Sequence, residues 1–547
     1  MKLKSRAEDK NGARSFMSSV LLLSFSTVIV KIIGLAFKIP MLSFLGAEGM
    51  GYFNSAYEIY AILCVVSTAG LPVALSILVS TARSNNDRIR VKRVYRAAKY
   101  IFGIFGFGAS ILMIVFSRQL AEAIGNPDAY RCIVAIAPAL LLVCLASAIR
   151  GYCQGFEYMT PTAISQLIEA VGKLVFGILL AILAIKRGYQ VYSVAAYAVF
   201  GITVGSFLSV VYLALAKLVK HPEKAMCRVG GNVRKAGGET RELISIALPI
   251  TLGSTVLGLT RIIDMALIMR RLGEQGIPIS RINTIYGAYT TLAIPVFSLI
   301  PALITPISMA LIPQLSAFAN KQDREGERTV IENSVRLTTL LSMPASFGIT
   351  LFSRPILELL FNGQSEAIDI SAPLLAMLGS SVLFSCLITT TNAVLQSYRH
   401  VCLPIVSMII GVAVKTISTY VLLGTDNVGI MGAPIGSLLC NLTVVLINFC
   451  FMKKYTNASL RSSILFFKPL MASCISVCAA FVLYLYLISY FSSKMLAFAV
   501  AIIFAAVTYM GFAFLTGSLT KEDIMLFPKG ERFIKFIDMK KIKNRDS

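Results

Sequence analysis

Charged side chains inside long apolar stretches are the residues of this sequence that could do chemistry. The basic ones are Lys31, Lys38, Lys173, Arg261 and Lys415. The acidic ones are Asp264 and two secondary candidates, Glu58 and Glu169. A charge at the centre of a lipid bilayer costs on the order of 3 kcal/mol on insertion scales, so such side chains normally face protein or a water-filled interior. We therefore take these residues as candidates for a binding site.

The balance of charge within this set indicates the sign of a ligand. Glu169 lies one helical turn before Lys173, and Arg261 lies one turn before Asp264, so each pair is expected to neutralise itself locally. The basic residues still outnumber the acidic ones. A positive excess suits a phosphate or diphosphate, which lysine binds as a point charge and arginine through its planar fork. The alternative is that these charges only hold helices together.

The composition requires the elements around these charges to be membrane helices. Of the 547 residues 56% are hydrophobic and 14% are charged, whereas soluble domains are about 25% charged. Runs of about 20 apolar residues are typical of bilayer-spanning helices. Such runs lie at 16–45, 50–82, 97–117, 132–154, 160–185, 191–217, 242–270, 282–319, 329–352, 370–397, 402–424, 429–452, 462–491 and 495–516. The sequence therefore predicts an all-α polytopic membrane protein of about fourteen transmembrane helices.

The distribution of basic residues predicts the orientation of the chain. The net charge of +24 could suggest a nucleic-acid partner, but the basic residues gather in alternate loops. The two termini and the even-numbered loops carry 36 Lys and Arg residues, against 9 in the other loops. Because basic loops stay in the cytoplasm, we expect both termini there, in a bacterial cytoplasmic membrane. Membrane lipids are the expected surroundings, and no nucleic-acid partner is expected.

Catalytic and metal-binding residues are scarce. The eleven cysteines form no CxxC pair, and the two histidines, His221 and His400, lie in predicted loops. No metal, cofactor or enzymatic activity is therefore expected. A membrane glycosyltransferase or lipid phosphatase is disfavoured because the predicted extracytoplasmic loops are short and poor in His, Asp and Glu. No nucleotide-binding motif occurs, so we expect transport to be coupled to membrane potential or to a cation gradient.

An internal repeat relates two parts of the chain. Phe116-Ser117-Arg118 recurs as Phe352-Ser353-Arg354, and Lys31-Ile32-Ile33 recurs as Arg261-Ile262-Ile263. Three further positions recur at one constant offset: Gln154, Ser165 and Lys173 become Gln396, Ser407 and Lys415. Each copy would hold six spans, so the copies are parallel repeats related by an axis along the membrane normal.

The repeat predicts how the chain is divided. We expect an N-lobe at 1–225, a cytoplasmic linker at 226–240 and a C-lobe at 241–455. Two extra helices follow at 456–520, and a basic tail at 521–547. Equivalent positions of parallel lobes meet across the central axis. The cations Lys31, Arg261, Lys173 and Lys415 are thus expected around one cavity, with Lys38, and with Gln154 and Gln396 as secondary candidates.

Three stretches in the first two spans resemble a known family. They are KIIGLAFKIP at 31–40, LGAEGMG at 45–51 and STAGLPVA at 67–74. They are similar to the SpoVB/YtgP branch of MurJ-like flippases, in the multidrug/oligosaccharidyl-lipid/polysaccharide (MOP) exporter superfamily. Lys31 and Gly34 stand at the family's first-helix Arg and Gly, whereas Phe37-Lys38 replaces its Arg-Asp pair. The resemblance implies two lobes around a cationic cavity with alternating access, and a groove for a polyprenyl tail at the two extra helices.

The function expected from these features is the flipping of an undecaprenyl-diphosphate-linked cell-wall precursor, lipid II or a close relative. A flippase for another lipid-linked polysaccharide repeat would share the fold. A drug or ion antiporter of the same superfamily would be expected to carry unpaired acidic residues, which the basic excess disfavours. A scaffold without transport would leave the symmetric cations unexplained.

Overall fold

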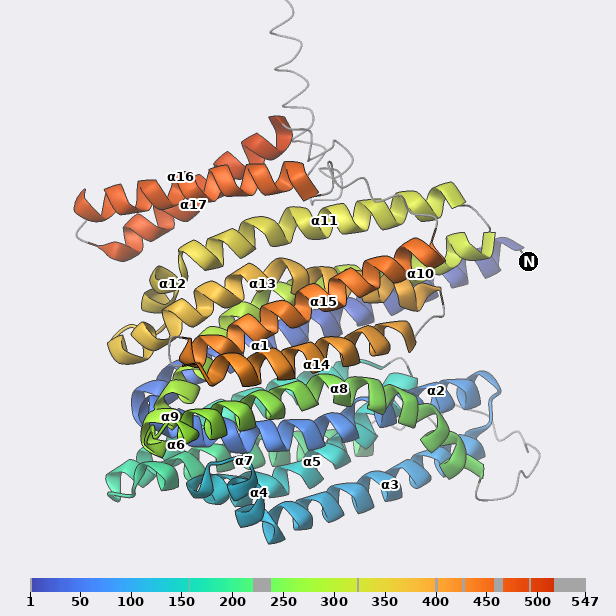
Figure 1. Ribbon diagram of the computed structural model, residues 1–547. Helices are drawn as coiled ribbons and strands as arrows, with labels where there is room; N and C mark the ends of the chain where they lie inside the picture. Colours follow the sequence, from blue (N-terminus) through green and yellow to red (C-terminus); the bar gives the residue numbers. More distant parts are fainter. Residues whose placement is uncertain are drawn as a thin grey trace, which may run out of the picture. The chain divides into compact units, whose positions relative to one another are not determined.

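The computed structural model describes residues 2–156, 158–219, 238–321, 324–398, 402–425, 428–456, 466–490 and 493–515. These residues form helices joined by short connections, with no strand among them (Figure 1). In chain order the α-helices are α1 (Lys2–Thr68), α2 (Gly70–Ser84), α3 (Arg88–Val115), α4 (Ser117–Ala123), α5 (Tyr130–Gly155), α6 (Thr160–Lys186), α7 (Val191–Val219), α8 (Gly238–Glu274), α9 (Ile279–Ala288), α10 (Ile294–Lys321), α11 (Arg324–Leu351), α12 (Ser353–Leu360), α13 (Ser365–Ser397), α14 (Cys402–Leu423), α15 (Gly432–Tyr455), α16 (Lys468–Tyr490) and α17 (Lys494–Leu515). A π-helical turn, Tyr289–Ala293, joins α9 to α10.

Most of these helices are long and apolar enough to cross a membrane. Within the described residues eleven stretches qualify, or twelve if α11 and α12, bent by 80° at their junction, make one span. One of the eleven, Ile29–Ser84, is 56 residues long and so would extend far beyond the roughly 30 Å of a bilayer core. It holds two spans. With α8, which has 37 residues, the fold is compatible with the fourteen predicted helices.

The first two spans are divided differently from the sequence prediction. The predicted gap at 46–49 is a single interruption at Gly46, whose φ of 66° and ψ of 177° break helix α1 without ending it. The predicted second span, 50–82, is instead interrupted at Ala69, between α1 and α2. A Cβ at Gly70 would lie 2.2 Å from the Ala247 carbonyl oxygen of α8. Only glycine allows α2 and α8 to approach so closely.

The repeated Phe-Ser-Arg motif folds into the same corner in both copies. α3 ends before Phe116 (φ −96°, ψ 16°) and the short helix α4 begins at Ser117. α11 ends before Phe352 (φ −99°, ψ 20°) and the short helix α12 begins at Ser353. Both serines are buried, at 6% and 7% exposure. The repeat seen in the sequence is therefore also a repeat of local structure.

The described helices pack into two compact units, which we call unit 1 and unit 2. Unit 1 comprises residues 1–291 and 419–433, and unit 2 comprises 292–418 and 434–547. In unit 1, α6 and α7 approach closely through Gly172 against Gly205 and Gly177 against Gly201. In unit 2, α13 packs on α10 and α11, and α16 packs on α11 and α17. The predicted lobe boundaries stay a prediction, and most of the linker and the whole basic tail lie outside the described residues.

Candidate functional site

Two polar side chains of α1 are bound to the π-helical turn. The Lys38 ammonium donates a hydrogen bond to the Thr290 carbonyl oxygen at 2.7 Å. The Asn54 side-chain amide donates to the hydroxyls of Thr290 and Thr291, both at 2.9 Å. Pro295 follows this turn and has no N–H, so the regular helical hydrogen bonds are interrupted here. Lys38 lies before the Gly46 break and Asn54 after it, so both arms of α1 are fixed to one point.

Lys173 of α6 lies among aromatic rings. Its ammonium nitrogen is 5.0 Å from the ring centroid of Phe37 and 5.0 Å from that of Tyr57. Both rings belong to α1, and Phe37 is only 1% exposed. A cation held against aromatic faces gains about 0.5–2 kcal/mol without an acidic partner. The Lys173 side chain of α6 is therefore held against two aromatic faces of α1.

The ion pair of Glu169 differs from the local pair with Lys173 that the sequence predicts. Its carboxylate does not pair with Lys173 but with Arg150 of α5, at 2.8 Å. Arg150 also donates hydrogen bonds to the hydroxyls of Ser165, at 2.9 Å, and Ser209, at 3.0 Å. Arg150 lies within α5, and its side chain is 12% exposed. Arg150 is a polar centre that joins α5, α6 and α7.

Arg261 of α8 lies near the charges of α1. It is within electrostatic range of Lys31 and Lys38. Glu58, also on α1, is within range of both Arg261 and Lys38 and of Asp264. The structure thus brings together Lys31 and Arg261, the two cations related by the repeat, within unit 1.

The remaining predicted residues are placed separately. Gln154 lies in the last turn of α5, one turn after Arg150. Lys415 lies on α14 and Gln396 near the end of α13, both in unit 2. Gln396 is exposed. Whether these residues share a cavity with those of unit 1 stays a prediction.

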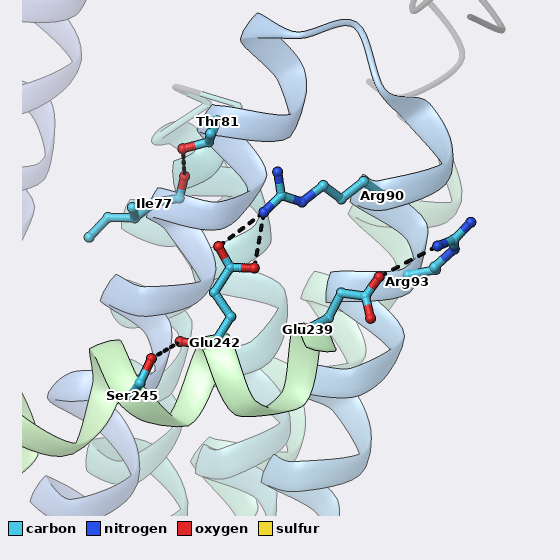
Figure 2. A network of polar contacts seen from close by, with 7 residues as sticks. All are labelled: Ile77, Thr81, Arg90, Arg93, Glu239, Glu242 and Ser245. Atoms are coloured by element: carbon cyan, nitrogen blue, oxygen red, sulfur yellow. Dashed lines mark hydrogen bonds and ion pairs between the residues drawn. The ribbon is translucent and has the colours of Figure 1, made fainter. Parts of the chain in front are cut away.

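Ion pairs also join α8 to α3. Figure 2 shows Arg90 of α3 with both carboxylate oxygens of Glu242, each at 3.0 Å, and Arg93 beside Glu239 at 3.6 Å. Glu239 and Glu242 lie in the first turns of α8. Both oxygens of Glu242 accept from one nitrogen of Arg90, Nη2, in a charge-assisted contact. The start of α8 is therefore tied to α3 by two ion pairs.

The unit 1 cluster carries a positive excess. It contains four predicted cations, Lys31, Lys38, Lys173 and Arg261. Because Arg150 neutralises Glu169, the carboxylates left to balance them are Glu58 and Asp264. The described residues contain no group of three or more His, Cys, Asp or Glu side chains that could hold a metal. Such a cluster can attract and orient an anionic group by charge and hydrogen bonding.

The described helices, eleven or twelve of which are long and apolar enough to cross a bilayer, define a multi-pass membrane protein. A solved structure of lipid II flippase MurJ in an inward closed conformation aligns with a TM-score of 0.67 at 15% sequence identity, over 90% of this chain and 98% of that chain. The fold is that of the MOP superfamily.

The family follows from the sequence comparisons. The model described as "Polysaccharide biosynthesis protein" matches residues 16–319, and the MatE model matches 279–421. The chain belongs to the polysaccharide biosynthesis protein family. Two relatives from Bacillus subtilis are stage V sporulation protein B, 24% identical over 82% of this chain and 85% of the relative, and lipid II flippase MurJ, 26% identical over 81% and 85%. Of the proteins similar to this chain, MurJ is named as a flippase, and a solved structure of similar fold is that of a multidrug resistance MATE family transporter.

Proposed function

We propose that the protein is a flippase that moves a polyprenyl-diphosphate-linked glycan across the bacterial cytoplasmic membrane, with lipid II or a close relative as its cargo. The observation that carries the proposal is the positive excess in unit 1. Glu169 is ion-paired with Arg150 at 2.8 Å, and the Lys173 ammonium lies against aromatic rings of α1, where the anionic part of a ligand would approach it. The diphosphate is the part of such a cargo that needs cations in a membrane. The relative MurJ is named as a lipid II flippase, which supports the same cargo.

The proposed mechanism is alternating access. Lys31 and Arg261 would attract the diphosphate, and Lys38 and Lys173 would hold it, while the polyprenyl tail stays in lipid. Lys415 and Gln396 would complete the site from the second lobe. The α16–α17 region would provide the groove for the tail. Membrane potential or a cation gradient would reset the transporter, and both termini would be cytoplasmic.

A second cargo of the same chemical class has support of its own. The family model that matches residues 16–319 is described as a polysaccharide biosynthesis protein, which supports a polysaccharide repeat as cargo. Another lipid-linked polysaccharide repeat would present the same diphosphate and would differ only in its sugars. A drug antiporter receives no such support, because a cationic drug would be repelled by the excess positive charge.

Complementation tests the proposal directly. A bacterium depleted of its own lipid II flippase would receive the wild-type chain, an Arg261→Glu variant or a Lys186→Glu control. Lys186 is an exposed cation at the end of α6. We expect rescue by wild type and by the control. Arg261→Glu should abolish rescue, because reversing this charge removes the positive excess beside Lys31.

Two results would count against parts of the proposal. Rescue by Arg261→Glu, at wild-type abundance in the membrane, would show that the cluster does not bind the cargo. Failure of a well-inserted wild type would exclude lipid II and leave another lipid-linked glycan as the cargo.

A further inference from the structure

A separate cavity lies in unit 1, and its lining includes none of the residues of the cationic cluster. It has a volume of about 600 Å³ and is lined by residues of α3, α5 and α7. Along α3 the lining includes Lys92, Arg96, Lys99 and Gly103, which are spaced by four, three and four residues and so share one helix face. A Cβ at Gly103 would meet no atom within 4 Å. The cavity is therefore open along this face of α3.

The charge of this cavity is wholly positive. Four of its lining residues are basic: Lys92, Arg96, Lys99 and Lys217. None of the lining residues that the structure describes is acidic. Lys92, Arg96 and Lys99 are exposed, and Lys217 of α7 lies within electrostatic range of Lys99. Like charges gathered without a carboxylate repel one another, and an anion among them relieves that repulsion.

Aromatic rings form the inner wall and fix one of these cations. The Lys217 ammonium lies 3.0 Å from the ring centroid of Tyr95 and 4.5 Å from that of Tyr152. The two rings are themselves 4.8 Å apart. Lys217 of α7 is thus held by rings of two other helices, α3 and α5, without any acidic partner among the cavity's described residues. The inner wall therefore has a defined packing, in which two neighbouring tyrosine rings position the Lys217 ammonium.

An apolar strip continues from the basic end of the cavity along α3. Tyr100, Ile104, Phe107 and Ile111 are 66%, 74%, 58% and 43% exposed, and their spacing places them on one helix face. Exposed apolar side chains on a membrane helix face acyl chains. In Figure 1, α3 runs along an edge of its unit. A positive head-group cavity that leads into a lipid-facing strip has the shape and charge of a site for an anionic amphiphile.

We infer that α3, α5 and α7 form a binding site for an anionic phospholipid of the cytoplasmic leaflet. Its phosphate would lie among Lys92, Arg96, Lys99 and Lys217, and its acyl chains would follow the strip from Tyr100 to Ile111. The site is distinct from the proposed cargo site, because none of its residues belongs to the cluster around Lys38 and Arg261. Bound lipid would fix α3, and α3 is joined to α8 by the Arg90–Glu242 pair.

Native mass spectrometry of the full chain in detergent tests this site. The chain would be titrated separately with phosphatidylglycerol, phosphatidylcholine and inorganic phosphate. One variant is Lys92→Gln/Lys99→Gln, and its matched control is Lys186→Gln/Arg187→Gln, which removes two exposed cations at the end of α6. A third variant, Gly103→Leu, fills the cavity and keeps every charge.

Phosphatidylglycerol should bind more tightly than phosphatidylcholine. Each basic residue near an anionic head group contributes about fivefold, so Lys92→Gln/Lys99→Gln should weaken phosphatidylglycerol binding roughly 25-fold. The control should leave binding unchanged, and Gly103→Leu should weaken it by removing space. Equal binding by Lys92→Gln/Lys99→Gln and wild type would overturn the inference. So would displacement of the lipid by inorganic phosphate, which would show a phosphate site that has no need of acyl chains. The readout is binding, so it is independent of whether the chain flips lipid II.

Discussion

The two copies of the Phe-Ser-Arg corner share a backbone but not their surroundings. Phe116 and Phe352 differ by only a few degrees in φ and ψ. Phe116 is 47% exposed, whereas Phe352 is 4% exposed. Phe352 packs against rings of the two extra helices, with centroids 5.6 Å from Tyr484 of α16 and 5.7 Å from Phe498 of α17. Packing of α16 and α17, the helices outside the repeat, therefore buries Phe352 of the second copy in a hydrophobic core.

The polar end of the same motif shows the opposite difference. An asparagine follows the arginine by eight residues in both copies, as Asn126 and Asn362. Asn126 is fully buried, and its amide donates to Ser55 at 3.1 Å and to Asn283 at 2.7 Å. The equivalent Asn362 is exposed. The first copy is therefore anchored through its asparagine and the second through its phenylalanine. A repeat determines local conformation, while the neighbours of each copy decide which of its side chains stabilise the fold.

The largest expected effect distinguishes the two phenylalanines. Phe352→Ala should lower the free energy of unfolding by about 3–5 kcal/mol, the usual loss for a buried Phe. Phe116→Ala should cost less than about 1 kcal/mol, because its ring is half exposed. Thermal unfolding can be followed with a thiol-reactive dye, since the chain has no Trp and Cys386 is buried. Equal losses in the two variants would contradict the role assigned to α16 and α17.

The asparagines should show the reverse order with a smaller effect. Asn126→Ala leaves Ser55 and Asn283 without this partner inside unit 1 and should cost about 1–3 kcal/mol. Asn362→Ala should change stability by less than about 0.5 kcal/mol, because water replaces its contacts. The same dye assay applies, with the two variants compared at one detergent concentration. A larger loss from Asn362→Ala would show that the burial of Asn126 does not stabilise the protein.

The helices themselves were largely predictable from the sequence. The apolar run 132–154 corresponds to helix Tyr130–Gly155, and the run 191–217 corresponds to helix Val191–Val219. The agreement is expected because a membrane-spanning segment has to form all its backbone hydrogen bonds internally. The interruption at Ala69 was not predictable, since the closeness of Gly70 to Ala247 exists only after α2 and α8 have packed. Whether a segment forms a helix depends on its local sequence. The break at Ala69, in contrast, depends on packing between helices that are distant in the sequence.

The candidate site was predictable in its members but not in its pairings. Charges in apolar runs drew attention to Lys38 and Lys173, yet sequence spacing assigned Glu169 to the wrong cation. Arg150 was missed because it lies near the end of an apolar run, and its partner Glu169 is 19 residues away. One signal could have found it: Ser165 and Glu169 lie one turn apart on α6 and form a polar face that needs a partner.

The smallest expected difference concerns the two arginines of the corner. Arg354 pairs with Glu358 at 2.9 Å and with Asp369 at 2.8 Å, whereas Arg118 lies over the Tyr130 ring at 5.4 Å. Both side chains are exposed, so Arg354→Gln and Arg118→Gln should each cost no more than about 1 kcal/mol.

Salt should separate these two effects. At about 1 M salt the Debye length falls to roughly 3 Å, so the loss from Arg354→Gln should shrink toward zero in the thermal unfolding assay. Part of the loss from Arg118→Gln should persist, because the arginine stem also covers the Tyr130 ring. If the Arg354→Gln loss did not change with salt, its ion pairs would not be its contribution to stability.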